Sequence, residues 1–364
     1  MFGYTWIELL WIASAAIVLD WLIGDPRWIP HPVIWIGKWI CFLEMRLLRR
    51  TKTDQNRKIG AESAFAVQGD QTSSIKQPRM LPSPQDRKTG RARKKEERIA
   101  GLMLLLLTLG IAAGLTFAAA ALAHQIHPWL GYAVSVWLVA SALAVKGLKD
   151  AALQVWQPLT KGDLQQARQQ VGMIVGRDTD QLDEKEVVRA TVETVAENIV
   201  DAFVSPLFFA LIGGAPGAML YRAANTLDSM VGYQNEKYQH FGWASARFDD
   251  WLNWIPARIT GLLLIAAASV LPSMSGKRAA KSIRQFAHLH PSPNSGIAEA
   301  GAAGALGVQL GGVNTYDGAA SVRAHMGWRL RPLAANDILL VNRLLIAVSI
   351  ICLGGLQCVI WVVL

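Results

Sequence analysis

Three acidic residues in the stretch ETVAENIVDAFVSP, residues 193–206, stand four positions apart, namely Glu193, Glu197 and Asp201. On a helix this spacing places them along one face, about 6 Å apart per step. The segment that follows, LFFALIGGAPGAML, is almost wholly apolar, and ionised residues that enter a membrane segment are costly and usually functional. Mg²⁺ is held by one or two carboxylates together with substrate phosphates. The line of acids therefore predicts a magnesium–phosphate site at the membrane surface.

An alternative for the same helix face needs no metal ion. Arg189 precedes Glu193 by four residues, so the two side chains can pair across one helical turn. The acids would then form a solvated, salt-bridged face of a helix near the membrane. The spacing alone leaves both interpretations open.

A second polar stretch, residues 221–258, lies between apolar segments. Arg222, Asn225 and Asp228 are spaced by three in it, which places a cation, an amide and a carboxylate on one helical face. We expect this stretch to line a polar cavity, and an interfacial loop with aromatic anchors is the alternative. Its further polar candidates are Tyr233, Asn235, Glu236, Asp249 and Asp250.

Two shorter stretches contain groups that bind anions. The turn HLHPSPNSG, residues 288–296, precedes a predicted helix capped by Asn294 or Ser295, and the free N–H groups at a helix start attract phosphate. VGRDT, residues 175–179, contains an arginine that can hold a phosphate by two hydrogen bonds. No G-x-x-x-x-G-K-[ST] phosphate loop occurs in the chain. The glycines at 301, 304, 307 and 311 are therefore predicted to serve close helix packing.

The elements that must position these residues are membrane helices. Of 364 residues, 52% are hydrophobic and only 17% charged, and the mean hydropathy is +0.26. Several apolar runs approach the ~20 residues that cross a bilayer. We predict an all-α polytopic integral membrane protein with about four to six membrane segments, plus amphipathic and cytosolic helices. The expected spans are residues 5–23, 99–122, 129–146, 203–223, 256–272 and 338–364.

The span at 203–223 is expected to be broken or re-entrant. Pro206 and the sequence GGAPG, residues 213–217, interrupt it. Such breaks are tolerated where the backbone is buried in protein or lines a cavity, and they mark binding sites in membrane proteins. A simple kink is the alternative.

Residues 46–98 hold 15 Lys or Arg against 6 Asp or Glu, a surplus that equals the net charge of the whole chain, +9. The positive-inside rule places this segment in the cytoplasm. Residues 50–98 are predicted to be a disordered cytosolic loop inserted within a single membrane-embedded catalytic domain, residues 1–364. Phe65 is the one aromatic residue of the segment, which argues against nucleic acid and leaves anionic lipid headgroups as its expected contact.

These stretches, in this order, closely resemble the membrane-bound adenosylcobinamide-phosphate synthases of cobalamin biosynthesis, the CobD/CbiB family. The resemblance rests on GDPRWIPHPV near the start, VGRDT, the run from residue 193 to 260, and HPSPNSGIAEAGAAGALGVQLGG. It covers nearly the whole chain apart from about residues 50–98, where this chain is longer than the family usually is.

The resemblance implies an ATP- and Mg²⁺-dependent ligase in the inner cell membrane. Its reaction joins adenosylcobyric acid to (R)-1-amino-2-propanol phosphate, or to aminopropanol, by an amide bond and gives adenosylcobinamide phosphate. Because a carboxylate is a poor electrophile, we expect activation as an acyl phosphate, with positioned cations neutralising the phosphoryl charge. Expected partners are the corrinoid, the amine, membrane lipids and other late cobalamin-pathway enzymes.

The roles of single residues are our interpretation of the matching positions. The expected magnesium ligands are Glu193, Glu197 and Asp201. The expected acid–base groups near the amine are Asp228, Glu236 and Glu299. The expected substrate and phosphate contacts are Asp25, His31, Arg177, Asp178, Arg222, Asn225, Tyr233, Asn235, Asp249, Asp250, His290, Asn294 and Ser295.

Two other classes of function compete with the ligase. A polytopic transporter also uses broken helices and intramembrane carboxylates, although no inverted repeat is visible in this sequence. A scaffold for other corrinoid enzymes is the third class, and it would not need three acids in one line.

Overall fold

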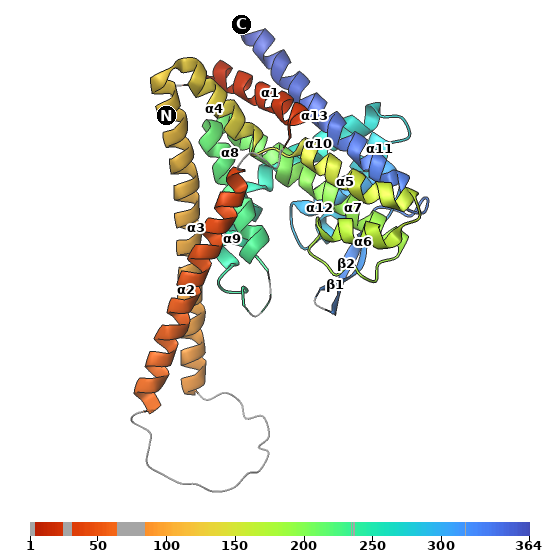
Figure 1. The fold of residues 1–364 in the computed structure, drawn as a ribbon. Coiled ribbons are helices and arrows are strands. Elements are labelled where there is room, and N and C mark those ends of the chain that lie inside the picture. The colour runs from red at the N-terminus through yellow and green to blue at the C-terminus, as the bar shows by residue number, and fades with distance from the viewer. Residues whose placement is uncertain (1–3, 25–30, 64–83, 234, 236, 317) are drawn as a thin grey trace. The chain divides into compact units, whose positions relative to one another are not determined.

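The structure, a computed structural model, describes residues 4–24, 31–233, 235, 237–316 and 318–364, apart from residues 64–83. Contacts divide the chain into two units. The first comprises Met1–Val33, Ala112–Arg222 and Asp250–Leu364, and the second comprises Ile34–Ile111 and Ala223–Asp249. The described residues are mostly helical (Figure 1), which confirms the predicted all-α class.

The elements follow one another along the chain as labelled in Figure 1. The helices are α1 (Trp6–Leu22), α2 (Pro32–Ser63), α3 (Pro84–Ile126), α4 (Pro128–Ala140), α5 (Val145–Thr160), α6 (Leu164–Gly172), α7 (Glu184–Ile199), α8 (Ser205–Val231), α9 (Trp243–Leu252), α10 (Trp254–Val270), α11 (Gly276–Phe286), α12 (Ser295–Leu306) and α13 (Asn336–Val363). A π-helical turn, Val200–Val204, joins α7 to α8, and a 3₁₀ turn, Ala287–Leu289, follows α11. The strands are β1 (Leu310–Tyr316) and β2 (Ala319–Met326).

Among the described residues, four helical segments are long and apolar enough to cross a membrane, and a bent pair of helices is a fifth candidate. The four are Ala92–Ile126, Pro128–Thr160, Glu184–Val231 and Asn336–Val363, and the bent pair is α9 with α10. This number lies within the predicted range. The expected first span, residues 5–23, forms α1, which has 17 residues and is not among the four.

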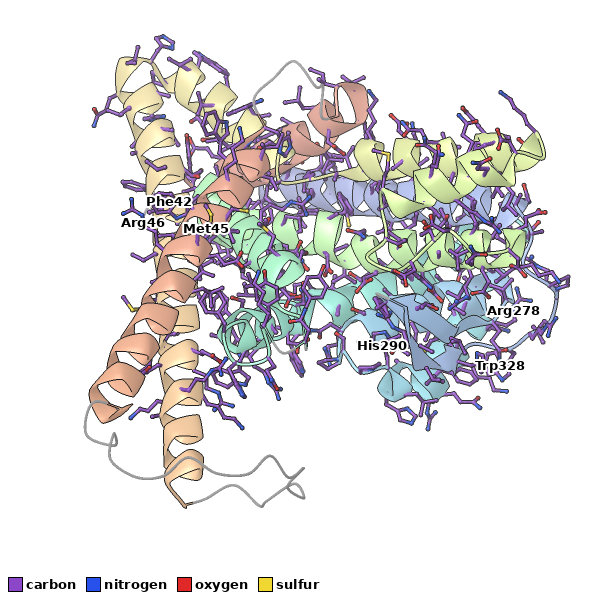
Figure 2. The ribbon with its side chains drawn as sticks, turned by 60° about the horizontal axis from the view of Figure 1, so that its bottom comes forward. Phe42, Met45, Arg46, Arg278, His290 and Trp328 are labelled. Carbon is purple, nitrogen blue, oxygen red and sulfur yellow. The ribbon has the colours of Figure 1, made fainter. Side chains whose placement is uncertain are left out.

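Helices α7 and α12 lie at the centre of the first unit. Nearly every residue of α12 is buried, and it packs closely against α10 and α11. Gly304 makes this approach possible, because a Cβ there would come within 2.6 Å of the Arg278 carbonyl oxygen. The Arg278 side chain (Figure 2) donates to the carbonyls of Gly304 and Ala305 and so satisfies the end of α12.

The predicted packing role is therefore correct for Gly304 but not for Gly307 and Gly311. Gly307 has φ 71° and ends α12 in the left-handed conformation, which glycine adopts without steric cost. Gly311 lies beyond the helix in β1. The spacing predicted one continuous helix through these glycines, but α12 ends before Gly307.

A β-hairpin is an addition to the predicted all-helical architecture. β1 and β2 pair antiparallel, with Val313 opposite Val322 and Thr315 opposite Ala320. β1 begins LGG, with Gly311 and Gly312 both at positive φ and a register irregularity between Leu310 and Gly312. Such a start hides the alternation by which a strand is recognised in a sequence.

The predicted interruption in the span at 203–223 is present inside α8. Gly214 has φ 60° and ψ −151°, which no helix contains, and Pro216 follows two residues later. A second irregularity precedes it, because the π-helical turn directs carbonyl groups toward other elements. The Ala202 carbonyl accepts from the Ala144 N–H at 2.9 Å, and the Asp201 carbonyl accepts from Arg222 at 3.4 Å.

The second unit contains the ends of the predicted disordered loop. Helix α2 continues to Ser63 and α3 begins at Pro84, so helix covers both ends of residues 50–98, whereas residues 64–83 lie outside the described residues. Charged, unbranched residues such as those of RARKKEER are good helix formers. Basic and aromatic side chains pair along α2, with Arg46 stacked 4.6 Å from the Phe42 ring (Figure 2).

Candidate functional site

Glu193 of α7 is almost fully buried, with 3% of its surface exposed, and both of its carboxylate oxygens are occupied. One oxygen accepts from Arg189 at 3.2 Å and from the Gly311 N–H at 2.7 Å, and the other accepts from Arg177. The pairing of Arg189 with Glu193, which the spacing left open, is therefore present. Glu193 anchors two arginines in this structure, and its expected role as a magnesium ligand stays a prediction.

Arg177 and Arg189 fasten the hairpin to α7. Arg189 donates to the carbonyls of Gly311 and Val313 at 2.7 and 2.9 Å, and to the Asn314 Oδ1 at 2.9 Å. Arg177 donates to the same Asn314 oxygen. The arginine expected to hold a phosphate is thus engaged by protein groups.

Asp178 also serves the hairpin. Its N–H donates to the Thr315 carbonyl at 2.8 Å, and its carboxylate accepts from the Gly318 N–H at 2.9 Å. The sequence VGRDT therefore holds β1 and the turn after it in place. Its predicted contact with phosphate has no support in these interactions.

Glu197, one turn beyond Glu193, meets the start of α12. Its carboxylate accepts a hydrogen bond from the Ser295 hydroxyl at 2.9 Å. Both side chains are half-buried. Two stretches that sequence analysis selected separately, the acid line and the HPSPNSG turn, are thus brought together although they are 98 residues apart.

Glu299 lies just beyond the first turn of α12 and is 2% exposed. Its Oε1 is 3.5 Å from the Nε2 of His290 (Figure 2), and neither atom has a hydrogen bond to any other described residue. The Ser292 N–H donates to the His290 Nδ1 at 3.0 Å. The same Nδ1 lies 3.3 Å from the Ser292 carbonyl oxygen, so Nδ1 faces the backbone and Nε2 faces Glu299.

The electrostatic setting of this pair favours a retained proton. Burial raises the pKa of Glu299, and the nearby charges of Glu193 and Glu197 act in the same direction, although His290 opposes them. Burial by itself would lower the pKa of His290, but its interaction with Glu299 outweighs burial and raises it. Glu299 is therefore a stronger base than an ordinary carboxylate.

Arg323 of β2 completes this cluster, and sequence analysis missed it. Burial opposes its charge, but Tyr316 and the acids Glu299, Glu197 and Glu193 raise its pKa overall. Its Nη2 donates to the Tyr316 hydroxyl at 3.0 Å. No motif marks Arg323, because its position depends on the register of a hairpin that the sequence did not reveal.

The HPSPNSG turn is built differently from the prediction. The side chain of Asn294 does not cap α12; it donates to the Asp250 carbonyl at 2.7 Å and accepts from Arg258 at 3.1 Å. The Ser292 hydroxyl instead accepts from the N–H groups of Asn294 and Ser295, at 3.3 and 3.4 Å. The turn is therefore tied to Asp250, whose carboxylate accepts from Ser292 at 3.4 Å.

The second unit holds the members of the other predicted group that lie between residues 223 and 249, whereas Arg222 and Asp250 belong to the first unit. The Asn225 side chain donates to Asp249 at 3.4 Å, so two of its members are in contact. Tyr233 is exposed, and the exposed Asn235 accepts from the Tyr238 N–H at 3.0 Å and stabilises a turn. Asp228 lies on α8, and its backbone carbonyl accepts from the Gly232 N–H at 2.7 Å.

Of three further predicted residues, the structure describes one. His31, in the first unit, accepts from the Val33 N–H at 3.3 Å. Asp25 and Glu236 lie outside the described residues.

The fit of this site to magnesium rests on few ligands. Among the described residues, no group of three or more His, Cys, Asp or Glu is arranged to hold a metal ion. With Glu193 held by arginines, Glu197 and Asp201 remain from the predicted set. Two carboxylates are an ordinary protein contribution to a Mg²⁺ site when substrate phosphates supply the other ligands.

Comparison with known proteins supports the resemblance seen in the sequence. The family model described as CobD/Cbib protein matches residues 13–70 and 79–345. The chain is 44% identical over 324 residues to the cobalamin biosynthesis protein CobD of Halalkalibacterium halodurans, covering 89% of this chain and 88% of that protein. It is 41% identical over 339 residues to the cobalamin biosynthesis protein CbiB of Salmonella typhimurium, covering 93% of each. No solved structure matches the chain.

Proposed function

The chain belongs to the CobD/CbiB protein family, and we propose that it is the ATP- and Mg²⁺-dependent ligase that joins adenosylcobyric acid to (R)-1-amino-2-propanol phosphate. Its relatives are named cobalamin biosynthesis proteins, which supports a role in that pathway. Free aminopropanol is the other possible amine. Four helices able to cross a membrane support a membrane protein. Placement in the inner membrane with the basic loop, residues 46–98, in the cytoplasm is part of the proposal.

The observation that carries the proposal is the buried cluster at the start of α12. It gathers Glu197, Ser295, Glu299, His290 and Arg323, and it offers a base, two cations and free carboxylate capacity in one place. Buried acids with perturbed pKa values and incomplete hydrogen bonding are typical of reaction sites.

Amide formation needs an activated carboxyl group and a neutral amine. In the proposed sequence the corrinoid carboxylate attacks the γ-phosphorus of ATP, which gives an acyl phosphate and ADP. The amine nitrogen then attacks the acyl carbon, and inorganic phosphate leaves. One proton leaves the nitrogen, and Glu299 accepts it, since its raised pKa suits it to take a proton from an ammonium group.

The remaining residues of the cluster stabilise charge and position in this proposal. Glu197 and Asp201 would hold Mg²⁺, which supplies neutralisation of the phosphoryl charge. Arg323 offers a further cation toward the same place, and Ser295 orients Glu197 through its hydroxyl. His290 faces Glu299 and tunes how strongly that carboxylate holds a proton.

The test uses purified protein in nanodiscs with adenosylcobyric acid, aminopropanol phosphate, ATP and Mg²⁺, and follows the corrinoids by mass spectrometry. We expect a product heavier by the amine minus water, with one ADP released for each amide formed. A parallel reaction with free aminopropanol identifies the preferred amine. Unchanged corrinoid and intact ATP in folded protein would favour a transporter or a scaffold instead.

A further inference from the structure

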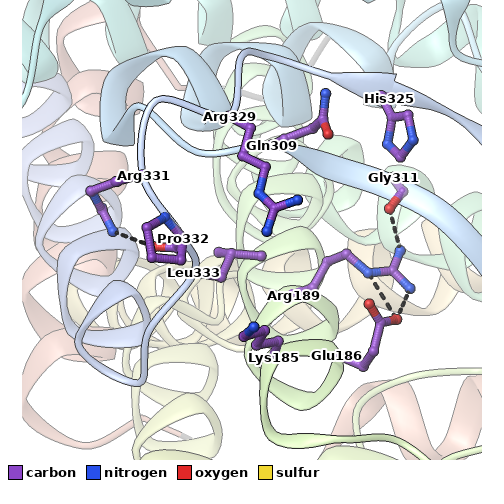
Figure 3. A pocket seen from close by; sticks show the side chains of 10 residues that line it. All are labelled: Lys185, Glu186, Arg189, Gln309, Gly311, His325, Arg329, Arg331, Pro332 and Leu333. Carbon is purple, nitrogen blue, oxygen red and sulfur yellow. Dashed lines mark hydrogen bonds and ion pairs between the residues drawn. The ribbon is translucent and has the colours of Figure 1, made fainter.

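A basic pocket of about 200 Å³, lined in part by Arg189, lies in the first unit (Figure 3). Its charged lining residues are Lys185, Glu186, Arg189, His325, Arg329 and Arg331. They come from the start of α7, the end of β2 and the loop that leads to α13. None of the residues predicted to bind metal or substrate or to act in acid–base chemistry lines this pocket.

Part of the positive charge in the pocket is not balanced by the surrounding protein. Glu186 is the only acid among the lining residues, and it is paired with Arg189. The side chains of Lys185 and Arg329 have no hydrogen bond or ion pair with any other described residue. Figure 3 shows the Arg329 side chain pointing inward from its loop, toward the side formed by Lys185 and Arg189.

The walls of the pocket are held in place before any ligand binds. The Arg189 guanidinium is buried and fixed by the carbonyls of Gly311 and Val313. On the opposite side, Arg331 donates to Asp337 at 2.9 Å, and the same carboxylate accepts from the Ala334 N–H at 2.9 Å. The loop that carries Arg329 is thus fastened to the start of α13, and preorganised cations bind an anion with little ordering cost.

Size and charge together select the class of ligand. The volume of the pocket, about 200 Å³, is below the roughly 300–1,000 Å³ typical of pockets for drug-sized ligands. The pocket therefore favours a small group such as phosphate. Guanidinium and ammonium groups bind phosphate by charge-assisted hydrogen bonds.

We propose that this pocket binds phosphate, either as a free anion or as the phosphate end of a larger molecule. The site is separate from the reaction site. Glu197 is eight residues beyond Arg189 on α7, about 12 Å along the helix axis. Glu193, which pairs with Arg189, lies between these two residues on the helix. The inference therefore does not depend on the proposed ligase reaction.

Direct binding to the full-length protein in nanodiscs of neutral lipid tests this proposal, with inorganic pyrophosphate as the calorimetric probe. We expect saturable binding by the wild type and binding at least about tenfold weaker in Arg329→Gln and in Lys185→Gln, because each loses a charged hydrogen-bond donor. The matched control is Arg284→Gln, which removes an exposed arginine of α11 outside the pocket and should bind as the wild type does. Because Lys185 and Arg329 have no described partner, both variants should melt at the wild-type temperature.

Competition then identifies the source of the phosphate. ATP, aminopropanol phosphate and inorganic phosphate are each added against pyrophosphate, and a fourth titration uses nanodiscs that contain anionic lipid. If one of these ligands displaces pyrophosphate from the wild type, and Arg329→Gln abolishes that displacement, the result supports the pocket and identifies its ligand. Wild-type binding that is absent, or that Arg329→Gln and Lys185→Gln leave unchanged, overturns the proposal.

Discussion

Glu193 and Glu299 are both buried carboxylates of the first unit, yet the surrounding groups compensate their charges to different extents. Glu193 is surrounded by two guanidinium groups and a backbone N–H, so its charge is fully compensated. Glu299 has one histidine at 3.5 Å and an oxygen with no hydrogen bond to a described residue. A compensated buried charge holds a structure together, whereas an incompletely compensated one is poised to exchange a proton.

Loss of Glu193 should give the largest effect and acts on stability. Glu193→Ala leaves Arg177 and Arg189 buried without their shared carboxylate, and breaking a buried pair costs about 3–5 kcal/mol. We expect a large fall in the midpoint of chemical unfolding and release of the hairpin, seen as faster amide exchange in β1. A stable Glu193→Ala protein that has lost only activity would reverse the comparison and make Glu193 the reacting group.

Glu299→Gln should leave the fold intact and slow the reaction. The amide keeps the size of the side chain but cannot accept the proton, and loss of a general base typically costs at least about a hundredfold in rate. Amide formation per folded molecule, measured with saturating substrates, checks this. Glu197→Gln is the informative comparison, because a loss that added Mg²⁺ partly restores points to metal binding there and not to proton transfer.

The pH dependence of activity tests the proton-accepting role of Glu299, which Glu193 does not share. Glu299 works as a base when ionised, so activity should rise with pH through its raised pKa, above the usual carboxyl range. His290 opposes that rise in pKa. In His290→Gln the pKa of Glu299 should therefore be higher still, and the acid limb of the rate profile should move to higher pH. An unchanged acid limb would separate His290 from the proton transfer.

Ser295→Ala should give the smallest effect of the series. It removes one half-buried hydrogen bond to Glu197, which is worth about 0.5–1.5 kcal/mol. We expect a modest fall in the melting temperature and a higher Mg²⁺ concentration for half-maximal activity. Ser269→Ala is the matched control, because that hydroxyl only returns to the Ile265 carbonyl of its own helix.

Local patterns in the sequence predicted much of the helical framework. The helix that carries Glu193 and Glu197, the break near Gly214 and the start of α12 all follow from short-range spacing and from residues with fixed backbone preferences. Asp201, the third acid of the line, lies instead in the π-helical turn. The contact between Glu197 and Ser295 was predicted only indirectly, because the acid line and the HPSPNSG turn were both expected to belong to a phosphate site. Proximity across 98 residues is a property of the packed fold and not of either segment.

The interactions of the arginines could not be predicted in the same way. Arg177 is attached to Glu193 and Asn314 because the hairpin folds over α7, and the hairpin itself begins with two glycines that carry no strand signal. Arg323 and the basic pocket depend on that same hairpin and on the loop after it. Without the hairpin, the sequence therefore predicts neither the protein contacts of Arg177 nor the place of Arg323.

The π-helical turn at Val200–Val204 has a consequence for how the chain tolerates insertions and deletions. Its Ala202 carbonyl is bonded to Ala144 of another element, and Ser205 just after it is bonded to Asn253 at 2.6 Å. Removing one residue from this turn would restore an ordinary helix and rotate everything beyond it by about 100° relative to α7. Family members should therefore vary in residue type between Glu197 and Ser205 but keep its length unchanged.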